Sequence, residues 1–479
     1  MGIRLIKLDC SQQQQHHHHF LLVIPLNTME GPKVQYMRQI YLEAYQTGNK
    51  PQTTKHTELR LEAQKRISKE GFNYADGSAS TEKTYKNNLN AFDKWQIVPR
   101  MLADTDIADA NMKTELFGTT FQTPFIISPI GVQELYHEDA DKATAQAGVA
   151  LGIPYTHSTA ASTSIEDVAS AADLDKEENH GWYQLYWPSD EKLTESLISR
   201  AKKAGFKALV VTLDTFALGW RPRDLNDGFN PFLSGKGVAN MLSDPYFIEQ
   251  YCEGKDPRGK EATKEDLFGA CVQAVNLVNP GISRKWSELS ILRKFWGDGP
   301  IILKGIQSLL DANRAVEAGA DGIWVSNHGG RQVDGAISSL HCLSAIGRYI
   351  RGLPLYLTPG IITDRNKASQ PTDLGLVYGV GREGDEDRAS KQRRRPYIIF
   401  DSGVRCGADA MKALALGADA VAIGRPWLWG LSVNGQEGVE TVFKGLAADL
   451  ELNMTLAGIQ STTQLNPNVL VKAGQEPHL

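Results

Sequence analysis

Short apolar runs rich in β-branched residues alternate with alanine-rich stretches of helical period between residues 121 and 424. This alternation constrains the fold more than any other feature, because it is typical of parallel strands joined by crossover helices. We predict an α/β protein built on a (β/α)8 TIM barrel, with an open doubly wound sheet as the alternative. The eight predicted strands are 125–127, 153–155, 182–185, 208–211, 301–303, 322–325, 397–400 and 420–423.

Helices are predicted between these strands, at residues 139–151, 191–204, 311–318 and 408–416 among others. The last three of them are followed at once by Gly205, Gly319 and Gly417. Glycine suits a helix end that turns back toward a sheet, since it adopts the left-handed backbone conformation without a steric penalty.

Two long stretches interrupt the alternation. Residues 215–300 follow the fourth strand and are far longer than an ordinary crossover, so we expect a lid over the active-site face of the barrel. Residues 358–395 are polar and precede the seventh strand, so we expect a solvated insert on the opposite face. The remaining divisions are a low-complexity, disordered tail over 1–30, a helical segment over 31–120, the barrel over 121–457 and a C-terminal tail over 458–479.

Composition and charge exclude several classes of function. The formal net charge is −5 at pH 7, and no basic excess is present to neutralise phosphates, so nucleic acid is not an expected partner. The five cysteines are scattered without disulfide-framework or zinc spacing, and we predict reduced thiols and no metal. The longest early apolar run, 20–26, is too short to span a bilayer. We therefore expect no membrane association and a cytoplasmic location, with the peroxisome and the mitochondrion as alternatives.

A Gly-x-Gly-x-x-Gly pattern at residues 379–384 matches the dinucleotide-binding fingerprint letter for letter. That fingerprint needs an amphipathic helix after the third glycine, whose amino end holds the pyrophosphate. Residues 385–395 are almost entirely charged or polar. The pattern therefore does not predict a nicotinamide site.

Polar or ionisable side chains follow every predicted strand, at the end where barrel enzymes carry their chemistry. Chance would account for two or three such positions, but not for all eight. Together with Ile130 and the glycines among them, the candidate residues at the strand ends are, in strand order, Ser128, Ile130 and Gly131; Ser158; Gln184 and Tyr186; Thr212 and Asp214; Lys304; Ser326, His328 and Arg331; Asp401, Gly403 and Arg405; and Gly424 and Arg425.

The loops after the last two strands combine glycines with Arg405 and Arg425. Free backbone amides and a guanidinium suit a phosphate, which barrels commonly bind after strands seven and eight. Asp401 is better suited to accept a hydrogen bond from a ribityl hydroxyl. Lys304 would place a cation under an electron-accepting ring. The alternative is a structural role, in which Lys304 forms a buried ion pair.

His328 lies three residues before Arg331. A histidine can take up a proton near neutral pH, and a guanidinium can hold a carboxylate through two hydrogen bonds. Arg221, after the fourth strand, could meet the same carboxylate, and Asp214 could hold the ring of His328. A lone histidine is more often structural, so the pairing with arginine is the informative feature.

These residues closely resemble the FMN-dependent α-hydroxy acid oxidising family. The most specific runs are 304–307, 326–332, 401–405 and 424–426, and the likeness extends over residues 59–456 apart from 358–395. Within that family, runs 130–132, 212–215 and 219–225 and the long lid are most similar to the lactate 2-monooxygenases.

The resemblance implies a role for each matching residue. His328 would be the proton acceptor, and Asp214 would orient it. Arg331 and Arg221 would bind the substrate carboxylate. Tyr74 and Tyr186 would bind the carboxylate or the hydroxyl. FMN would be bound by Ser128, Ile130, Gly131, Ser158, Gln184, Thr212, Lys304, Ser326, Asp401, Gly403, Arg405, Gly424 and Arg425. Gly131 stands where most relatives place an alanine, which predicts more room beside the flavin.

The implied reaction is the oxidation of an L-2-hydroxy acid to the 2-keto acid, with dioxygen reoxidising the FMN and forming peroxide. If the lid retains the keto acid, peroxide decarboxylates it in place, and the net reaction is a monooxygenation such as lactate to acetate. The alternative enzyme is a simple oxidase or dehydrogenase that releases the keto acid, including one that serves a specialised pathway. The alternative of another class is an inactive, flavin-free scaffold. The resemblance also implies a homotetramer.

Overall fold

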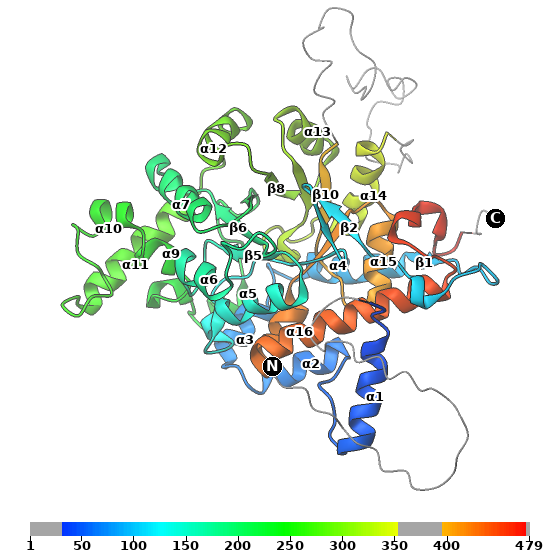
Figure 1. The fold of residues 1–479 in the computed structure, drawn as a ribbon. Helices are drawn as coiled ribbons and strands as arrows, with labels where there is room; N and C mark the ends of the chain where they lie inside the picture. The colour runs from blue at the N-terminus through cyan, green and yellow to red at the C-terminus, as the bar shows by residue number, and fades with distance from the viewer. Residues whose placement is uncertain (1–30, 353–394, 476–479) are drawn as a thin grey trace, which may run out of the picture.

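A computed structural model describes residues 31–352 and 395–475 (Figure 1). Residues 1–30 and 358–394, where a tail and a polar insert are predicted, lie outside the described residues, and so does the glycine pattern at 379–384. Eight parallel strands form a closed barrel in the order β10-β11-β4-β5-β6-β7-β8-β9, which confirms the TIM barrel and excludes the open sheet. They are β4 (Phe125–Ile127), β5 (Tyr155–Ser158), β6 (Gly181–Tyr186), β7 (Ala208–Thr212), β8 (Ile301–Ile306), β9 (Gly322–Val325), β10 (Tyr397–Phe400) and β11 (Ala420–Ile423).

The observed strands match the predicted ones to within one residue at each end, except at two places. β5 begins after Pro154 rather than at residue 153, because proline has no N–H to donate to the strand ladder. β8 continues beyond its predicted end to Ile306, with a register shift against β9 at Gly305, whose φ is +101°.

The crossover helices surround the barrel. Four correspond to predicted helices, and the backbones of Gly205, Gly319 and Gly417 have positive φ, as expected for helix ends that turn into the next strand. The helices that lead from one barrel strand to the next are α5 (Ala140–Leu151), α6 (Ile165–Ala171), α7 (Glu191–Lys203), α13 (Leu309–Glu317), α14 (Ser339–Ile350) and α15 (Gly407–Ala415), and α16 (Arg425–Leu456) follows the last strand.

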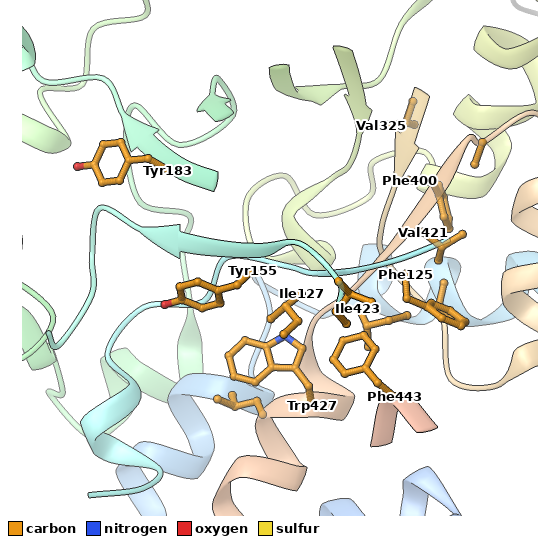
Figure 2. Packing of buried hydrophobic residues seen from close by; sticks show 14 of the residues in the cluster. Phe125, Ile127, Tyr155, Tyr183, Val325, Phe400, Val421, Ile423, Trp427 and Phe443 are labelled. Atoms are coloured by element: carbon orange, nitrogen blue, oxygen red, sulfur yellow. The ribbon is translucent and has the colours of Figure 1, made fainter. Parts of the chain in front are cut away.

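Side chains alternate across each strand and form two cores. Ile126, Val210, Ile302, Trp324 and Ile399 fill the interior of the barrel. On the outer surface, the side chains of Phe125, Ile127, Val421 and Ile423 pack with two aromatic residues of α16, Trp427 and Phe443 (Figure 2). Strands buried on both faces explain why the sequence shows continuous apolar runs rather than alternation.

A small hairpin closes the amino-terminal end of the barrel. It consists of β2 (Thr114–Leu116) and β3 (Thr119–Phe121). At its turn the ring of Phe117 packs edge-on against Trp182 and Tyr397, with ring centroids 5.7 and 4.9 Å away. The opposite, carboxyl-terminal end is the one that carries the polar residues.

The segment before the barrel contains α1 (Gln35–Thr47), α2 (His56–Gln64), α3 (Lys69–Asp76) and α4 (Lys83–Asp93). It also contains β1 (Trp95–Ile97), which pairs antiparallel with β12 (Leu470–Lys472). Residues that the sequence suggests only as a C-terminal tail therefore form a sheet with the amino-terminal segment.

The long stretch after β7 contains α8 (Pro222–Asn226), α9 (Ala239–Leu242), α10 (Pro245–Tyr251), α11 (Lys264–Val278) and α12 (Leu289–Trp296). The last of these packs on α7, as a crossover helix of the barrel does. We therefore use "lid" for residues 215–280. In the part of the chain that the structure describes, no helix is long and apolar enough to cross a membrane.

Candidate active site

One cavity opens at the carboxyl-terminal end of the barrel, and most of the residues predicted from strand ends line it. The residues in this lining are Tyr74, Ser128, Ile130, Gly131, Tyr186, Arg221, Lys304, His328, Arg331, Asp401, Gly403, Arg405, Gly424 and Arg425. The other predicted residues lie behind this lining and contact it: Ser158, Gln184, Thr212, Asp214 and Ser326.

His328 and Asp214 form a hydrogen-bonded pair. Nδ1 of His328 lies 3.0 Å from Oδ1 of Asp214, and Thr215 donates its hydroxyl to the same oxygen at 2.7 Å. The backbone of His328 is left-handed, with φ +58°, and its N–H donates to the Ser326 hydroxyl at 3.0 Å. Because Nδ1 is engaged, Nε2 is the ring atom left to exchange a proton with a bound molecule.

Electrostatics suit this pair to proton transfer. Burial lowers the pKa of His328, and the charge of Asp214 only partly opposes that effect, so the imidazole is neutral near pH 7 and can accept a proton. Burial by itself would raise the pKa of Asp214, but the charges of His328 and Lys304 outweigh it and hold the pKa at about 2. The carboxylate is therefore ionised and can stabilise the imidazolium once it forms.

Two arginines lie over the ring of Tyr74, which α3 brings to the barrel. The guanidinium carbons of Arg331 and Arg221 are 5.2 and 5.9 Å from its centroid. Arg331 donates to the carbonyls of Tyr74 and Gly77, Arg221 donates to Gln332, and neither guanidinium has an acidic partner within ion-pair distance among the described residues. Burial and the charge of Arg331 lower the pKa of Arg221. Two neighbouring cations, one buried (Arg221) and one half-buried (Arg331), without an ion-pair partner among the described residues form a site for an anion such as a carboxylate.

Tyr186, at the end of β6, stacks on His328. The two ring centroids are 6.4 Å apart and the planes differ by 26°. Burial and the nearby charge of Asp214 raise the pKa of Tyr186, so its hydroxyl stays protonated and can donate a hydrogen bond. A basic nitrogen, a phenolic donor and an anion site therefore share one side of the cavity.

A chain of buried polar side chains crosses three neighbouring strands beneath the cavity. Ser158 on β5 donates to Oε1 of Gln184 on β6 at 3.1 Å, and Gln184 donates to the hydroxyl of Thr212 on β7 at 3.0 Å. Side chains of this kind can donate to and accept from the polar edge of a heterocycle.

Lys304, on β8, lies in the floor of the same cavity. Its Nζ donates to Ser326 at 3.1 Å and lies 3.7 Å from Oδ2 of Asp401. Lys304 therefore does form the buried ion pair that the sequence left open as an alternative to cofactor binding. Trp324 also donates to that carboxylate oxygen, at 3.0 Å. Lys304 nevertheless lines the cavity, where its cation faces whatever binds there.

The loops after β10 and β11 bring two more cations to the cavity. Among the described residues, the Arg405 guanidinium donates to the carbonyl of Val404 through Nη1. Its other N–H groups are therefore available to a bound molecule. The Arg425 guanidinium donates to carbonyls of Ala75, Gly77 and Gly329, and burial lowers its pKa to about 9.

The donor set of this cavity fits FMN. The hydroxyl of Ser128, which lines the cavity wall, is buried without a hydrogen-bond partner. One wall thus offers an unsatisfied hydrogen-bond donor, the floor offers a lysine, and the far loops offer arginines. Together these groups match a polar ring joined to a phosphate.

Gly131 does not leave the extra room expected of it. A Cβ built at Gly131 would lie 2.3 Å from the carbonyl oxygen and 2.8 Å from the Cβ of Ala160. The place of the missing methyl is therefore already filled by the loop after β5, and the expectation that Gly131 widens the cavity is wrong. The glycine instead allows the loops after β4 and β5 to pack closely together.

Two residues of the site were not given a role from the sequence. Asn88 of α4 exchanges hydrogen bonds with Asn327, at 2.8 and 2.7 Å, and so fixes the turn that carries His328. No sequence signal distinguishes it from other polar helix residues. Gln332 donates to the carbonyl of Asp214 at 2.7 Å and accepts from Arg221 at 3.2 Å. Its position in the specific run 326–332 is the signal that could have found it.

The chain belongs to the FMN-dependent dehydrogenase family, whose model matches residues 63–365 and 387–472. The break in that match falls within the predicted insert. Membership establishes FMN as the cofactor, and it places the protein among the FMN-dependent 2-hydroxy acid oxidoreductases.

Individual relatives agree with this assignment. An FMN-dependent alpha-hydroxy acid dehydrogenase of Schizosaccharomyces pombe is 39% identical over 448 residues, covering 92% of this chain and 96% of the relative. An L-lactate oxidase of Lysinibacillus sphaericus is 37% identical over 404 residues, covering 84% and 88%. The crystal structure of a mandelate oxidase superposes with a TM-score of 0.65 at 30% identity, covering 88% of this chain and 98% of that one.

Proposed function

We propose that the protein oxidises an L-2-hydroxy acid to the 2-keto acid and uses dioxygen as the electron acceptor. The observation that carries this proposal is the contact of 3.0 Å between His328 and Asp214, in a cavity that the buried Arg221 and the half-buried Arg331 also line. A proton acceptor beside an anion site is the arrangement that a substrate with adjacent hydroxyl and carboxylate groups requires.

Each residue of the cavity then has a role in the proposal. Arg331 and Arg221 hold the substrate carboxylate, and Tyr74 and Tyr186 donate hydrogen bonds to the carboxylate or hydroxyl. His328 accepts a proton at Nε2, and its ring is held by Asp214. Bound FMN supplies a two-electron acceptor. We assign its binding to Ser128, Ile130, Gly131, Ser158, Gln184, Thr212, Lys304, Ser326, Asp401, Gly403, Arg405, Gly424 and Arg425.

A second candidate is oxidative decarboxylation within the closed cavity, as in a lactate 2-monooxygenase. The first step converts the hydroxy acid and O2 into the keto acid and H2O2. The second converts these two products into the shortened acid, CO2 and water. The observation in its favour is that lid residues, among them Phe232 and Met241, form part of the cavity wall and would retain the keto acid.

Anaerobic rapid mixing of the holoenzyme with L-2-hydroxy acids tests the first proposal. We expect bleaching of the flavin absorbance, and we expect His328→Asn to abolish it while FMN stays bound. His341→Asn, on α14 outside the cavity, is the matched control and should reduce normally. Undiminished reduction in His328→Asn would overturn the role of His328.

Product analysis in air separates the two outcomes. Keto acid with one equivalent of peroxide indicates an oxidase, whereas the shortened acid with CO2 and no free peroxide indicates decarboxylation in place. A flavin that is bleached by substrate but not reoxidised by dioxygen would overturn dioxygen as the acceptor. We also propose a homotetramer, which sedimentation of the holoenzyme tests.

A further inference from the structure

The stereochemistry of the substrate leaves one direction for its side chain. The reacting carbon of a 2-hydroxy acid carries a carboxylate, a hydroxyl, a hydrogen and a side chain. In the proposed function, Arg331 and Arg221 take the carboxylate, His328 takes the hydroxyl proton, and the hydrogen leaves toward the cofactor. In this arrangement the lid offers a wall for the side chain, since its residue Phe232 lies beside Tyr74 at the carboxylate-binding arginines.

Most of that wall is apolar, and its polar residues besides Arg221 are Thr215 and Asn279, the latter with a buried side-chain oxygen that has no hydrogen-bond partner. Its side chains come from three lid segments, and Arg221 is the one charged lid residue among the described residues that line the cavity. Phe232 packs edge-on against the ring of Tyr74, with centroids 6.4 Å apart. The wall comprises Phe232 of η3 (Pro231–Ser234), Val238 and Met241 at α9, and Ala274, Val275 and Val278 on one face of α11.

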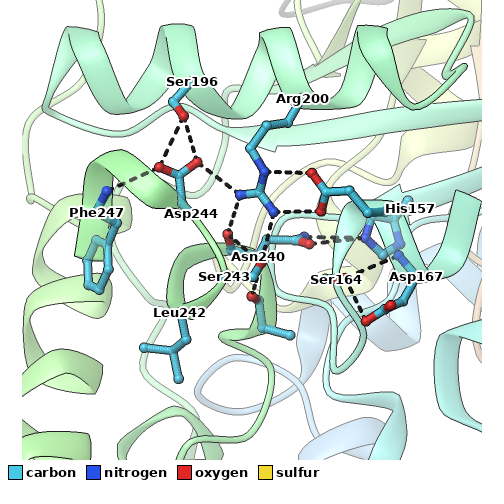
Figure 3. Close-up of polar contacts among 12 residues, drawn as sticks. His157, Ser164, Asp167, Ser196, Arg200, Asn240, Leu242, Ser243, Asp244 and Phe247 are labelled. Carbon is cyan, nitrogen blue, oxygen red and sulfur yellow. Dashed lines mark hydrogen bonds and ion pairs between the residues drawn. The ribbon is translucent and has the colours of Figure 1, made fainter. Parts of the chain in front are cut away.

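The wall is held in place by contacts that involve no substrate. Next to Met241, Asn240 donates to the carbonyls of Ser158 and Thr159, at 2.9 and 3.2 Å. Arg200 of α7 donates to the carbonyl of Asn240 at 2.8 Å and to Asp244 at 2.9 Å (Figure 3). Asn240 and Asp244 are fully buried. The α9 part of the lid wall is thus fixed to β5 and α7 by contacts that exist before substrate binds.

We infer that this wall binds the side chain of a 2-hydroxy acid larger than lactate, either branched aliphatic or aromatic. The inference rests on the proposed function and names its substrate class. The methyl group of lactate can cover only a small part of an apolar wall built from six side chains. Each further methylene that becomes buried there raises kcat/KM about fourfold.

A panel of L-2-hydroxy acids with side chains of increasing size tests the inference. The probes are lactate, 2-hydroxybutyrate, 2-hydroxyisocaproate and 3-phenyllactate, each mixed anaerobically with the holoenzyme. We expect the second-order rate constant of flavin reduction to be at least about tenfold higher for 2-hydroxyisocaproate or 3-phenyllactate than for lactate. Fastest reduction by lactate, with the rate falling as the side chain grows, would overturn the inference but leave the proposed function standing. Reduction by none of the acids would overturn the proposed function itself.

A pair of variants on α11 locates the effect. Val275→Phe should lower the selectivity for 2-hydroxyisocaproate over lactate about tenfold, because the added ring fills the space beside the wall. Gln273→Phe, on the exposed face of the same helix, adds the same ring outside the cavity and should keep the wild-type ratio. Equal changes of the ratio in both variants would contradict a side-chain site at this wall. Flavin absorbance and thermal unfolding of both holoenzymes report whether each variant is folded.

Discussion

Asp214 lies directly against Gly305, so that a Cβ added at Gly305 would be 3.0 Å from both Cβ and Cγ of Asp214. Gly305 has φ +101° and lies at the register shift of β8. A side chain at this position would be strained and would displace the carboxylate that holds His328. The glycine after Lys304 therefore supports the geometry of His328, the proposed proton acceptor.

Gly305→Ala should slow flavin reduction by at least about tenfold while FMN remains bound, because Asp214 has no room to stay beside His328. Gly269→Ala is the matched control. Gly269 lies within α11 with open space around it, and alanine there should stabilise the protein by about 0.5–1 kcal/mol without changing the rate. Anaerobic stopped-flow and urea unfolding measure the two quantities. An unchanged reduction rate in Gly305→Ala would show that Asp214 can move without consequence.

The rate of flavin reduction should fall as the pH drops through the pKa of His328, since only the neutral ring accepts a proton. Burial lowers that pKa below its usual 6.5, so we expect the decline below pH 6.5. In Asp214→Asn the charge that favours the imidazolium is lost, so the midpoint should move to still lower pH and the plateau rate should fall about a hundredfold or more. A midpoint that shifts upward in Asp214→Asn would contradict this electrostatic relationship.

Arg221→Lys should weaken substrate binding about tenfold or more, since an ammonium cannot donate two parallel hydrogen bonds to a carboxylate. Flavin spectral perturbation by a non-reacting carboxylate ligand measures the Kd directly. Arg66→Lys, exposed on the surface, is the control and should bind normally. A Kd unaffected by Arg221→Lys would remove this residue from the carboxylate site.

Arg200→Met should destabilise the folded protein by about 3 kcal/mol, because it leaves Asp244 buried without its ion-pair partner. Arg200→Met with Asp244→Asn should recover part of that loss, since the buried charge is then removed. Arg66→Met, which breaks an exposed contact of 3.8 Å with Glu62, should cost no more than about 0.5 kcal/mol. Urea unfolding of the holoenzymes provides the comparison, and equal losses at Arg200 and Arg66 would contradict the importance of the buried pair.

The barrel and the residues at its strand ends could be predicted because both follow from local pattern. Period and length identify strands such as 322–325, and the closed barrel then places the residues after each strand at one end. This rule predicted that Lys304, His328 and Arg331 lie close together, and in the structure all three line one cavity.

Residues that reach the cavity from elsewhere could not be predicted in this way. Asn88 and the lid residues Phe232 and Met241 are placed by tertiary packing, and no local period indicates where a lid folds back. Gly131 shows the same limit, because the space beside a glycine depends on the neighbouring loop of Ala160.

The hairpin that holds Phe117 against Trp182 and Tyr397 covers the amino-terminal end of a barrel whose interior is filled by side chains such as Ile126, Val210 and Trp324. A packed interior leaves no passage from one end of the barrel to the other, so in the proposed function substrate, dioxygen and product all enter and leave at the end that the lid covers. Under that proposal the product leaves by the same path through which the next substrate enters, so the filled barrel core makes binding of a new substrate wait for release of the previous product.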